Sequence, residues 1–309
     1  GFMKGTTPKQ FSPTGALTVA EAIVMADRLH EIYTTGQSTL TNGEPWYQTY
    51  VDYALENGIV QAGDFTSYTA KATRGQMAYL FSRALPASVL PSINNVQTLP
   101  DVTGSTKYSQ EIFSLYNAGV LTGSDVFGTF KPNDNIIRAE AAAILTRVAL
   151  PEQRKTVVLM KQVQWGVAKL AIPQSAGAGV TENGMYTVTS EQDACGVIAT
   201  SVTDAAYKGL SVTVLTEQQM NNILTQAFNS TDGKLSNAKS TKVSFGSVKA
   251  YRTVGILTTD EGAGDCLIFT YITGNKMDMI CLLAYENDTA LKNMANGLMV
   301  GGVTASPQF

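Results

Sequence analysis

The sequence predicts a multi-domain protein, with an all-α bundle of repeats over residues 1–154 followed by an α+β domain over residues 155–309. Two observations predict this division. A helix-opening motif occurs three times in the first half, and segments with the alternation typical of strands fill the second half. In addition, six of the seven arginines precede residue 155. A chain of 309 residues has room for two or three domains of ordinary size.

Composition excludes several classes of protein. A formal net charge of −3 without charge runs predicts no nucleic-acid partner. The chain contains no apolar run of the roughly 18 to 20 residues that a transmembrane helix needs, so no membrane span is expected. Its three cysteines all lie in the second half without CxxC spacing, which predicts neither a disulfide framework nor a zinc site.

The repeated motif opens a helix at residues 18–21, 73–76 and 137–140. Its first two copies are capping boxes, in which a threonine hydroxyl accepts the third N–H of the helix and a Glu or Gln side chain accepts the threonine N–H. The second and third copies carry Arg74 and Arg138 in the first helical turn, where a cation is unfavourable for the helix dipole. We therefore interpret both arginines as ligands for an anion, together with the unpaired N–H groups of the helix start.

Each repeat is predicted to contain a leading helix, a glycine turn, a loop and a capped second helix. In the second copy apolar residues at helical spacing from Tyr47 to Leu55 end at Gly58, and in the third copy the same pattern ends at Gly119. Glycine at these points predicts a left-handed C-cap. The second helices end in Arg28, Arg83 and Arg147.

The segment 118–149, AGVLTGSDVFGTFKPNDNIIRAEAAAILTRVA, resembles an S-layer homology repeat. Residues 46–85 are similar as a looser second copy, and residues 1–29 resemble the back half of a first copy. The repeats are accordingly placed at 1–36, 37–90 and 91–154, with the first one incomplete. The copies depart from the pattern at Val19, which replaces the arginine, and at Ile137, which replaces the capping threonine.

This resemblance implies a bundle of three two-helix prongs around a pseudo-threefold axis. It implies a secreted bacterial protein that is anchored noncovalently at the cell surface to a secondary cell-wall polymer linked to peptidoglycan, a polysaccharide that typically bears a pyruvyl ketal. An Arg fork suits the ketal carboxylate and an aromatic face suits the sugar ring. The expected polysaccharide-binding residues are Arg74, Arg138, Trp46, Gln76 and Glu140. Trp46 fits equally well as packing at a helix start. No cofactor, metal or catalytic residue is expected.

The incomplete first repeat leaves the helix at 18–32 without a partner from its own repeat. Its apolar face includes Ala22, Ile23, Ala26 and Leu29. We expect the other prongs, the second domain or another molecule to cover this face.

In the second half, strands are predicted at 185–190, 194–202, 210–215, 242–258, 265–273 and 276–285, and helices at 217–228 and 288–300. Both helices are amphipathic and should lie on an antiparallel sheet. The hairpin 265–285 is apolar on both faces, which predicts a central strand pair. This order of elements is similar to the PsbP/Mog1-like arrangement, which assigns no activity.

A loop at Gly274-Asn275 pairs residue 268 with residue 281 and leaves Cys266 one diagonal step from Cys281. A loop one residue earlier would place the two cysteines opposite each other. Because glycine suits the first loop position, we predict the former register and three free, buried thiols.

Catalytic candidates are scarce in the second half. His30, at the end of a first-half helix, is the only histidine of the chain, so residues 155–309 cannot form a Ser-His or Cys-His relay. The acidic residues Asp260, Glu261 and Asp265 are interpreted as a solvated loop. The leading hypothesis is a wall-anchored protein, not an enzyme, whose second domain binds an unidentified ligand or partner. The alternatives are a wall-attached hydrolase with its active site in residues 155–309, and an S-layer or surface assembly module.

Overall fold

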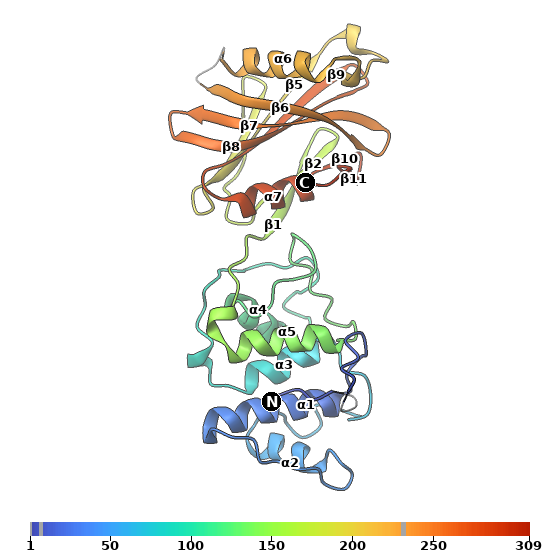
Figure 1. Cartoon of the computed structure of the whole chain (residues 1–309), viewed down its shortest axis with the longest axis vertical. Helices are drawn as coiled ribbons and strands as arrows, with labels where there is room; N and C mark the ends of the chain where they lie inside the picture. Colours follow the sequence, from blue (N-terminus) through green and yellow to red (C-terminus); the bar gives the residue numbers. More distant parts are fainter. Residues whose placement is uncertain (1, 6–8, 230–232) are drawn as a thin grey trace. The chain divides into compact units, whose positions relative to one another are not determined.

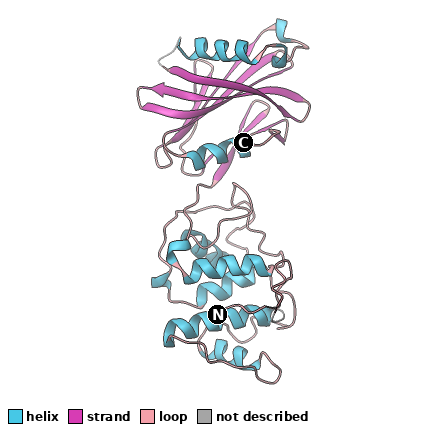
Figure 2. Cartoon of the chain, in the orientation of Figure 1, coloured by secondary structure: helices cyan, strands magenta, loops and turns pink. Residues whose placement is uncertain are grey.

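The computed structural model describes residues 2–5, 9–229 and 233–309. These residues form two compact units, residues 1–157 and residues 158–309. Helices and loops build the first unit, and a large antiparallel sheet builds the second (Figure 2).

The first unit contains five α-helices within its described residues. They are α1 (Val19–Thr35), α2 (Gln48–Glu56), α3 (Arg74–Arg83), α4 (Ser109–Asn117) and α5 (Arg138–Ala149), with short 3-10 helices at Ala87–Val89 and Pro151–Gln153 (Figure 1). α2 and α4 are the expected leading helices, and α1, α3 and α5 are the expected second helices. Gly58 and Gly119 have φ of +67° and +73°, so both predicted left-handed turns are confirmed.

A closed ring of backbone hydrogen bonds joins the starts of α1, α3 and α5. Leu17 N–H donates to Ile136 O (3.1 Å), Ile136 N–H to Ala72 O (3.0 Å), and Ala72 N–H to Leu17 O (2.8 Å). All three residues are buried. The three repeats therefore meet through residues that stand two positions before the first helical residue of each second helix.

The apolar face of α1 is covered from within the same unit. Ala22, Ile23, Ala26 and Leu29 are buried, as predicted, and α1 packs against α2 and α3. Asp27 lies on the same helix and is fully buried, with no hydrogen-bond partner for either carboxylate oxygen. Its burial, with the nearby Glu31 carboxylate, raises the pKa of Asp27 to about 8.

The second unit is built around a seven-stranded antiparallel sheet of order β3-β4-β5-β9-β8-β7-β6. Its strands are β3 (Val180–Glu182), β4 (Met185–Ser190), β5 (Cys195–Thr203), β6 (Lys234–Phe245), β7 (Val248–Thr259), β8 (Gly262–Thr273) and β9 (Lys276–Ala284). A smaller sheet contains β1 (Met160–Trp165), β2 (Ala168–Pro173), β10 (Met299–Val300) and β11 (Val303–Thr304).

Two helices cover the large sheet. α6 (Glu217–Asn229) packs on β6, and α7 (Asp288–Gly297) packs against β8, β9 and the small sheet. Figure 1 shows the two helices on opposite faces of the large sheet. The central position of β8 and β9 explains why both of their faces are apolar, and this prediction is confirmed.

Some strand predictions for this unit are wrong. The segment 242–258 is two strands, because Gly246 turns the chain with φ of +60°. Residues 210–215 contain a 3-10 helix at Val212–Val214, where the Ser211 hydroxyl accepts the Thr213 N–H. The interpretation of Asp265 as part of a solvated loop is also wrong, because Asp265 lies within strand β8, in agreement with the predicted strand 265–273.

The hairpin register is confirmed. Ile268 pairs with Cys281 across β8 and β9, and Gly274 and Asn275 form the loop. Cys195, Cys266 and Cys281 are free and buried, and burial raises the pKa of the Cys195 thiol to about 12. The Cys195 thiol is therefore a poor nucleophile.

Candidate functional site

The first N–H groups of α3 and α5 are not free. Each donates to a backbone carbonyl of a loop from another repeat, at 2.9 Å in every case. The bonds run from Arg74 to Asp134, from Gly75 to Pro132, from Arg138 to Gly15 and from Ala139 to Pro13. The expectation that these N–H groups form anion sites is therefore wrong, because loops distant in sequence occupy them.

The side chain of Arg74 also joins two repeats. Its Nε donates to Phe130 O (2.7 Å), its Nη1 forms an ion pair with Glu140 Oε1 (2.7 Å), and its guanidinium lies 5.0 Å from the centre of the Phe130 ring. Gln76 completes the capping box of α3 through its side chain and its N–H. Arg74 and Glu140 thus satisfy each other and the backbone, and Gln76 bonds to Thr73 within its own helix start.

Gly75 allows the close packing at this point. A Cβ there would lie 3.1 Å from Pro132 O and 3.5 Å from Tyr108 Cδ2. Glycine stands at position 75, where α1 and α5 carry Ala20 and Ala139, and it allows this approach of the neighbouring repeat.

Arg138 makes the equivalent contacts with a looser ion pair. Its Nε donates to Phe11 O (2.8 Å), its Nη2 donates to Lys4 O, and its guanidinium lies 5.1 Å from the centre of the Phe11 ring. Its Nη1 is 3.7 Å from Glu21 Oε1, against 2.7 Å between Arg74 and Glu140. Backbone carbonyls thus hold Nε and Nη2 of Arg138 in place. The ion pair of its Nη1 with Glu21 is longer than the ion pair of Arg74 with Glu140.

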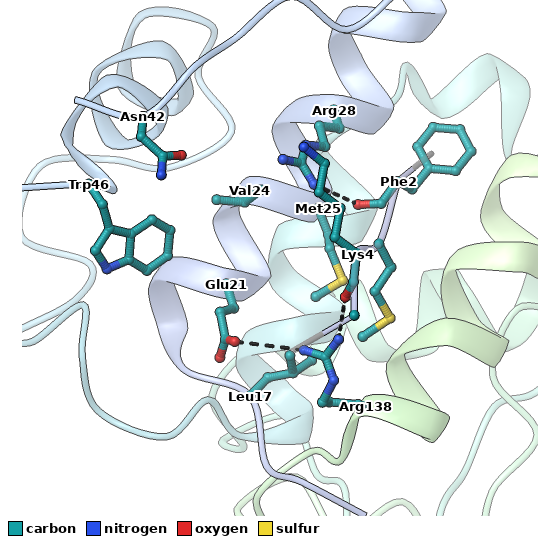
Figure 3. A pocket seen from close by; sticks show the side chains of 12 residues that line it. Phe2, Lys4, Leu17, Glu21, Val24, Met25, Arg28, Asn42, Trp46 and Arg138 are labelled. Carbon is teal, nitrogen blue, oxygen red and sulfur yellow. Dashed lines mark hydrogen bonds and ion pairs between the residues drawn. The ribbon is translucent and has the colours of Figure 1, made fainter. Parts of the chain in front are cut away.

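A pocket of about 430 Å³ opens beside Arg138. Four segments line it: the N-terminal residues, helix α1 with the residue Leu17 just before it, the loop that leads to α2, and the start of α5. Its lining residues are Phe2, Met3, Lys4, Gly5, Leu17, Glu21, Val24, Met25, Arg28, Asn42, Trp46 and Arg138. In Figure 3, Trp46 and Asn42 lie on one side of the pocket, and Arg28, Lys4 and Arg138 lie on the other.

Three cationic side chains and one carboxylate line this pocket. Arg28 donates weakly to Phe2 O (3.4 Å), and Glu21 Oε2 accepts the Thr18 N–H of the capping box (2.8 Å). The net charge of the lining is positive, which favours an anionic ligand. Trp46 is 41% exposed and offers an aromatic face at the same opening.

Of the predicted site residues, the structure brings only Trp46 and Arg138 into one pocket. Arg74 and Glu140 lie together at another junction between repeats, and Gln76 lies in the capping box of α3. The analysis of the sequence missed Lys4, Glu21, Arg28 and Asn42 as pocket residues. Glu21 and Arg28 share one face of α1 at helical spacing, which was the available signal.

Residues 98–142 match the family model of the S-layer homology domain. The chain contains an S-layer homology domain. This match covers the greater part of the third repeat, including Arg138 and Glu140. An S-layer homology domain indicates association with the cell surface or cell wall of a bacterium. No curated protein matches the chain.

Two solved structures are similar to about half of the chain. The solution structure of cyanobacterial PsbP (CyanoP) from Synechocystis sp. PCC 6803 matches 46% of this chain and 92% of that chain, with 12% identity and a TM-score of 0.36. A crystal structure from Bacteroides thetaiotaomicron VPI-5482 matches 43% of this chain and 45% of that chain, with 8% identity and a TM-score of 0.28. A PsbP-like protein is thus among the structural neighbours of this chain.

In the described part of the chain, no helix has both the length and the apolar character needed to cross a membrane. Among the same residues, no cluster of three or more His, Cys, Asp or Glu side chains could hold a metal ion.

His30 is half-buried within α1 and has a structural contact. Its Nδ1 lies 2.8 Å from the Tyr53 hydroxyl, which belongs to α2. Burial lowers the pKa of His30. The residue therefore links two helices and stands outside the pocket.

Proposed function

We propose that the helical unit anchors the protein noncovalently to a secondary cell-wall polymer, and that the pocket beside Arg138 binds an anionic sugar of that polymer. The observation that carries this proposal is the convergence of Arg138, Arg28, Lys4 and Trp46 on one opening, in a chain that contains an S-layer homology domain.

The chemistry of the lining favours a carboxylate on a sugar, such as a pyruvyl ketal. A guanidinium recognises a carboxylate through two parallel N–H bonds, and an indole face covers the apolar side of a sugar ring. Arg138 is presented rigidly, because Phe11 O and Lys4 O hold its other donors. Asn42 at the same opening can donate to sugar hydroxyls.

Arg74, Gln76 and Glu140 have another role in this proposal. Arg74 and Glu140 hold the second and third repeats together, Gln76 caps α3, and none of the three touches the ligand. The tight ion pair between Arg74 and Glu140 supports this assignment, because a carboxylate ligand would have to displace Glu140 from the arginine. The closed ring of bonds among Leu17, Ala72 and Ile136 supports a pseudo-threefold arrangement of the repeats.

The second unit is, in this proposal, the part that the anchor displays outside the cell, where it binds a ligand or partner. A hydrolase is less well supported, because Asp260 and Glu261 lie in the turn between β7 and β8 and Asp265 is paired within the sheet. An assembly module would require a second copy of the chain to pair with this unit.

Sedimentation of the full chain with purified Gram-positive sacculi tests the proposal. We expect the protein to pellet with untreated sacculi and to remain in the supernatant after the secondary polymer has been stripped with hydrogen fluoride. Equal pelleting with stripped sacculi, or no pelleting with either, would contradict it.

A further inference from the structure

The surroundings of α1 and α3 differ at two equivalent positions. At the start of α1 the neighbouring repeat supplies Arg138, whereas at the start of α3 the equivalent residue is Val19, which is buried. On the helix itself, Tyr79 of α3 stands where α1 has Val24. The start of α3 therefore has no cation equivalent to Arg138, and α3 carries an aromatic ring where α1 carries Val24.

Tyr79 belongs to a continuous row of six aromatic side chains. Neighbouring ring centres are separated by 5.5 Å (Trp46 to Tyr47), 5.6 Å (Tyr47 to Tyr68), 6.5 Å (Tyr68 to Phe65), 6.4 Å (Phe65 to Tyr79) and 4.7 Å (Tyr79 to Tyr108). We call these six residues the aromatic row. They come from four separate segments: the start of α2, the loop before α3, α3 itself and the start of α4.

The aromatic row is not part of the unit's core. The same unit buries Tyr50, Phe81, Tyr116 and Phe130 to 2% exposure or less. In the row, Trp46 is 41% exposed, four other rings are half-buried and only Tyr79 is buried. Trp46 and the four half-buried rings of the row therefore provide an accessible apolar surface that is suited to a ligand.

Charge and hydrogen bonding along the row favour a polar, uncharged ligand. Arg83 lies 5.1 Å from the ring centre of Tyr79, Lys107 lies 4.8 Å from that of Tyr108, and Asp64 accepts the Tyr79 hydroxyl (2.5 Å). Both signs of charge flank the rings, so the row has no strong preference for an anion. Aromatic faces beside polar groups match a sugar ring, which has apolar faces and a rim of hydroxyls.

The row begins in the pocket. Trp46 lines the pocket and is also the first ring of the row. We propose that the aromatic row binds uncharged sugar residues of a polysaccharide whose anionic residue occupies the pocket beside Arg138. This inference rests on the proposed function and extends it, because it assigns a second contact surface to the same chain of sugars.

Ligands of two lengths distinguish binding in the pocket from binding on the aromatic row, because only a long chain can reach both. The probe is polysaccharide released from Gram-positive sacculi by hydrogen fluoride and fractionated into single repeating units and long chains. Calorimetry compares the intact full-length protein with the variant Phe65→Ala/Tyr68→Ala. The matched control is Tyr33→Ala, since Tyr33 is a 50% exposed aromatic residue of α1 outside the row. Thermal unfolding of each variant verifies that it is folded.

The row variant should bind long chains at least about fivefold more weakly than the intact protein, the loss expected for truncating a contact aromatic residue. It should bind single repeating units within about twofold of the intact protein, as should Tyr33→Ala for both ligands. If the double variant fails to fold, Tyr68→Leu keeps the apolar volume and removes the aromatic face.

Unchanged affinity of a folded row variant for long chains would overturn the inference while the proposed function stands. Equal loss for both ligand lengths would also overturn it, because the row would then act only by supporting the pocket. No binding of either ligand by the intact protein would instead overturn the proposed function.

Discussion

Helices α3 and α5 start alike and yet differ in what surrounds them. Each begins with an arginine, Arg74 in α3 and Arg138 in α5. Both arginines donate to the carbonyl of a phenylalanine, lie over its ring and face a glutamate of another repeat. Arg74 is in close contact with Glu140, whereas Arg138 is 1 Å farther from Glu21 (3.7 Å against 2.7 Å) and lines the pocket.

We conclude that the main role of the arginine in this motif is to connect two repeats. Its Nε and the face of its guanidinium are used in the same way at both positions. Whether it can also meet a ligand depends on the neighbouring chain, which at Arg138 leaves an opening between Trp46 and Arg28. A motif that is repeated in sequence therefore does not imply a binding site that is repeated in space.

The largest expected effect concerns α1, which differs from the other second helices by its buried Asp27. Because the folded pKa is raised, folding binds a proton, and stability is present at low pH and is lost as the pH rises toward about 8. Each pKa unit corresponds to about 1.4 kcal/mol, so the free energy of unfolding should fall on the order of 4 kcal/mol from pH 5 to pH 8.

Urea unfolding followed by circular dichroism measures this pH dependence. The variant Asp27→Asn is the control, because it keeps the shape of the side chain and removes its titration. An equal pH dependence in Asp27→Asn and in the intact protein would show that Asp27 is ionised in the folded state.

Arg138→Ala should have the next largest effect, and it concerns binding. Removing a charged hydrogen bond to the polymer should cost about 1.5 to 3 kcal/mol, a loss of affinity of roughly 10- to 150-fold. Arg138→Lys should recover part of this loss, because a lysine supplies charge without the planar fork. Surface plasmon resonance on immobilised polymer measures the affinities, and wild-type affinity in Arg138→Ala would remove this residue from the site.

Arg74→Ala should have a smaller effect of a different kind. The unit should lose about 1 to 2 kcal/mol of stability, since the partly exposed ion pair with Glu140 and the bond to Phe130 O are lost. The affinity for the polymer should change less than that of Arg138→Ala. If the affinity falls as much as in Arg138→Ala at equal stability, Arg74 also contacts the ligand.

The smallest expected effect is a gain from Ile137→Thr. The Glu140 carboxylate already accepts the Ile137 N–H (3.1 Å), but isoleucine cannot accept the Glu140 N–H as Thr18 and Thr73 do in their helices. A threonine should complete the capping box and stabilise the unit by about 0.5 to 1 kcal/mol. A lower urea midpoint would show that the half-buried isoleucine contributes more through packing.

The helices and the hairpin were predictable because their signals are local. Capping residues, left-handed glycines and apolar spacing all lie within a few residues of the elements that they specify, as at Thr73 and Gly58. Strand β2 was missed because its apolar run has no clear period, and β6 and β7 were merged because Gly246 is their only sharp break.

The site was only partly predictable because its decisive contacts connect distant residues. The carbonyls that occupy the first N–H groups of α3 and α5 come from Asp134 and Gly15, about 60 and 120 positions away in sequence. Lys4 and Arg28 reach the pocket only through the fold. Trp46 was predicted as an aromatic residue at a helix start, and it lines the pocket with 41% of its surface exposed.

The most direct test of the account is the affinity of the full chain for the polymer before and after its carboxylates have been reduced to alcohols. The central claim is that Arg138 and its pocket recognise a carboxylate on a sugar. We predict that reduction weakens binding of the intact protein at least about tenfold, the equivalent of one charged hydrogen bond, and that Arg138→Ala binds both forms equally. Equal affinity of the intact protein for native and reduced polymer would contradict the claim.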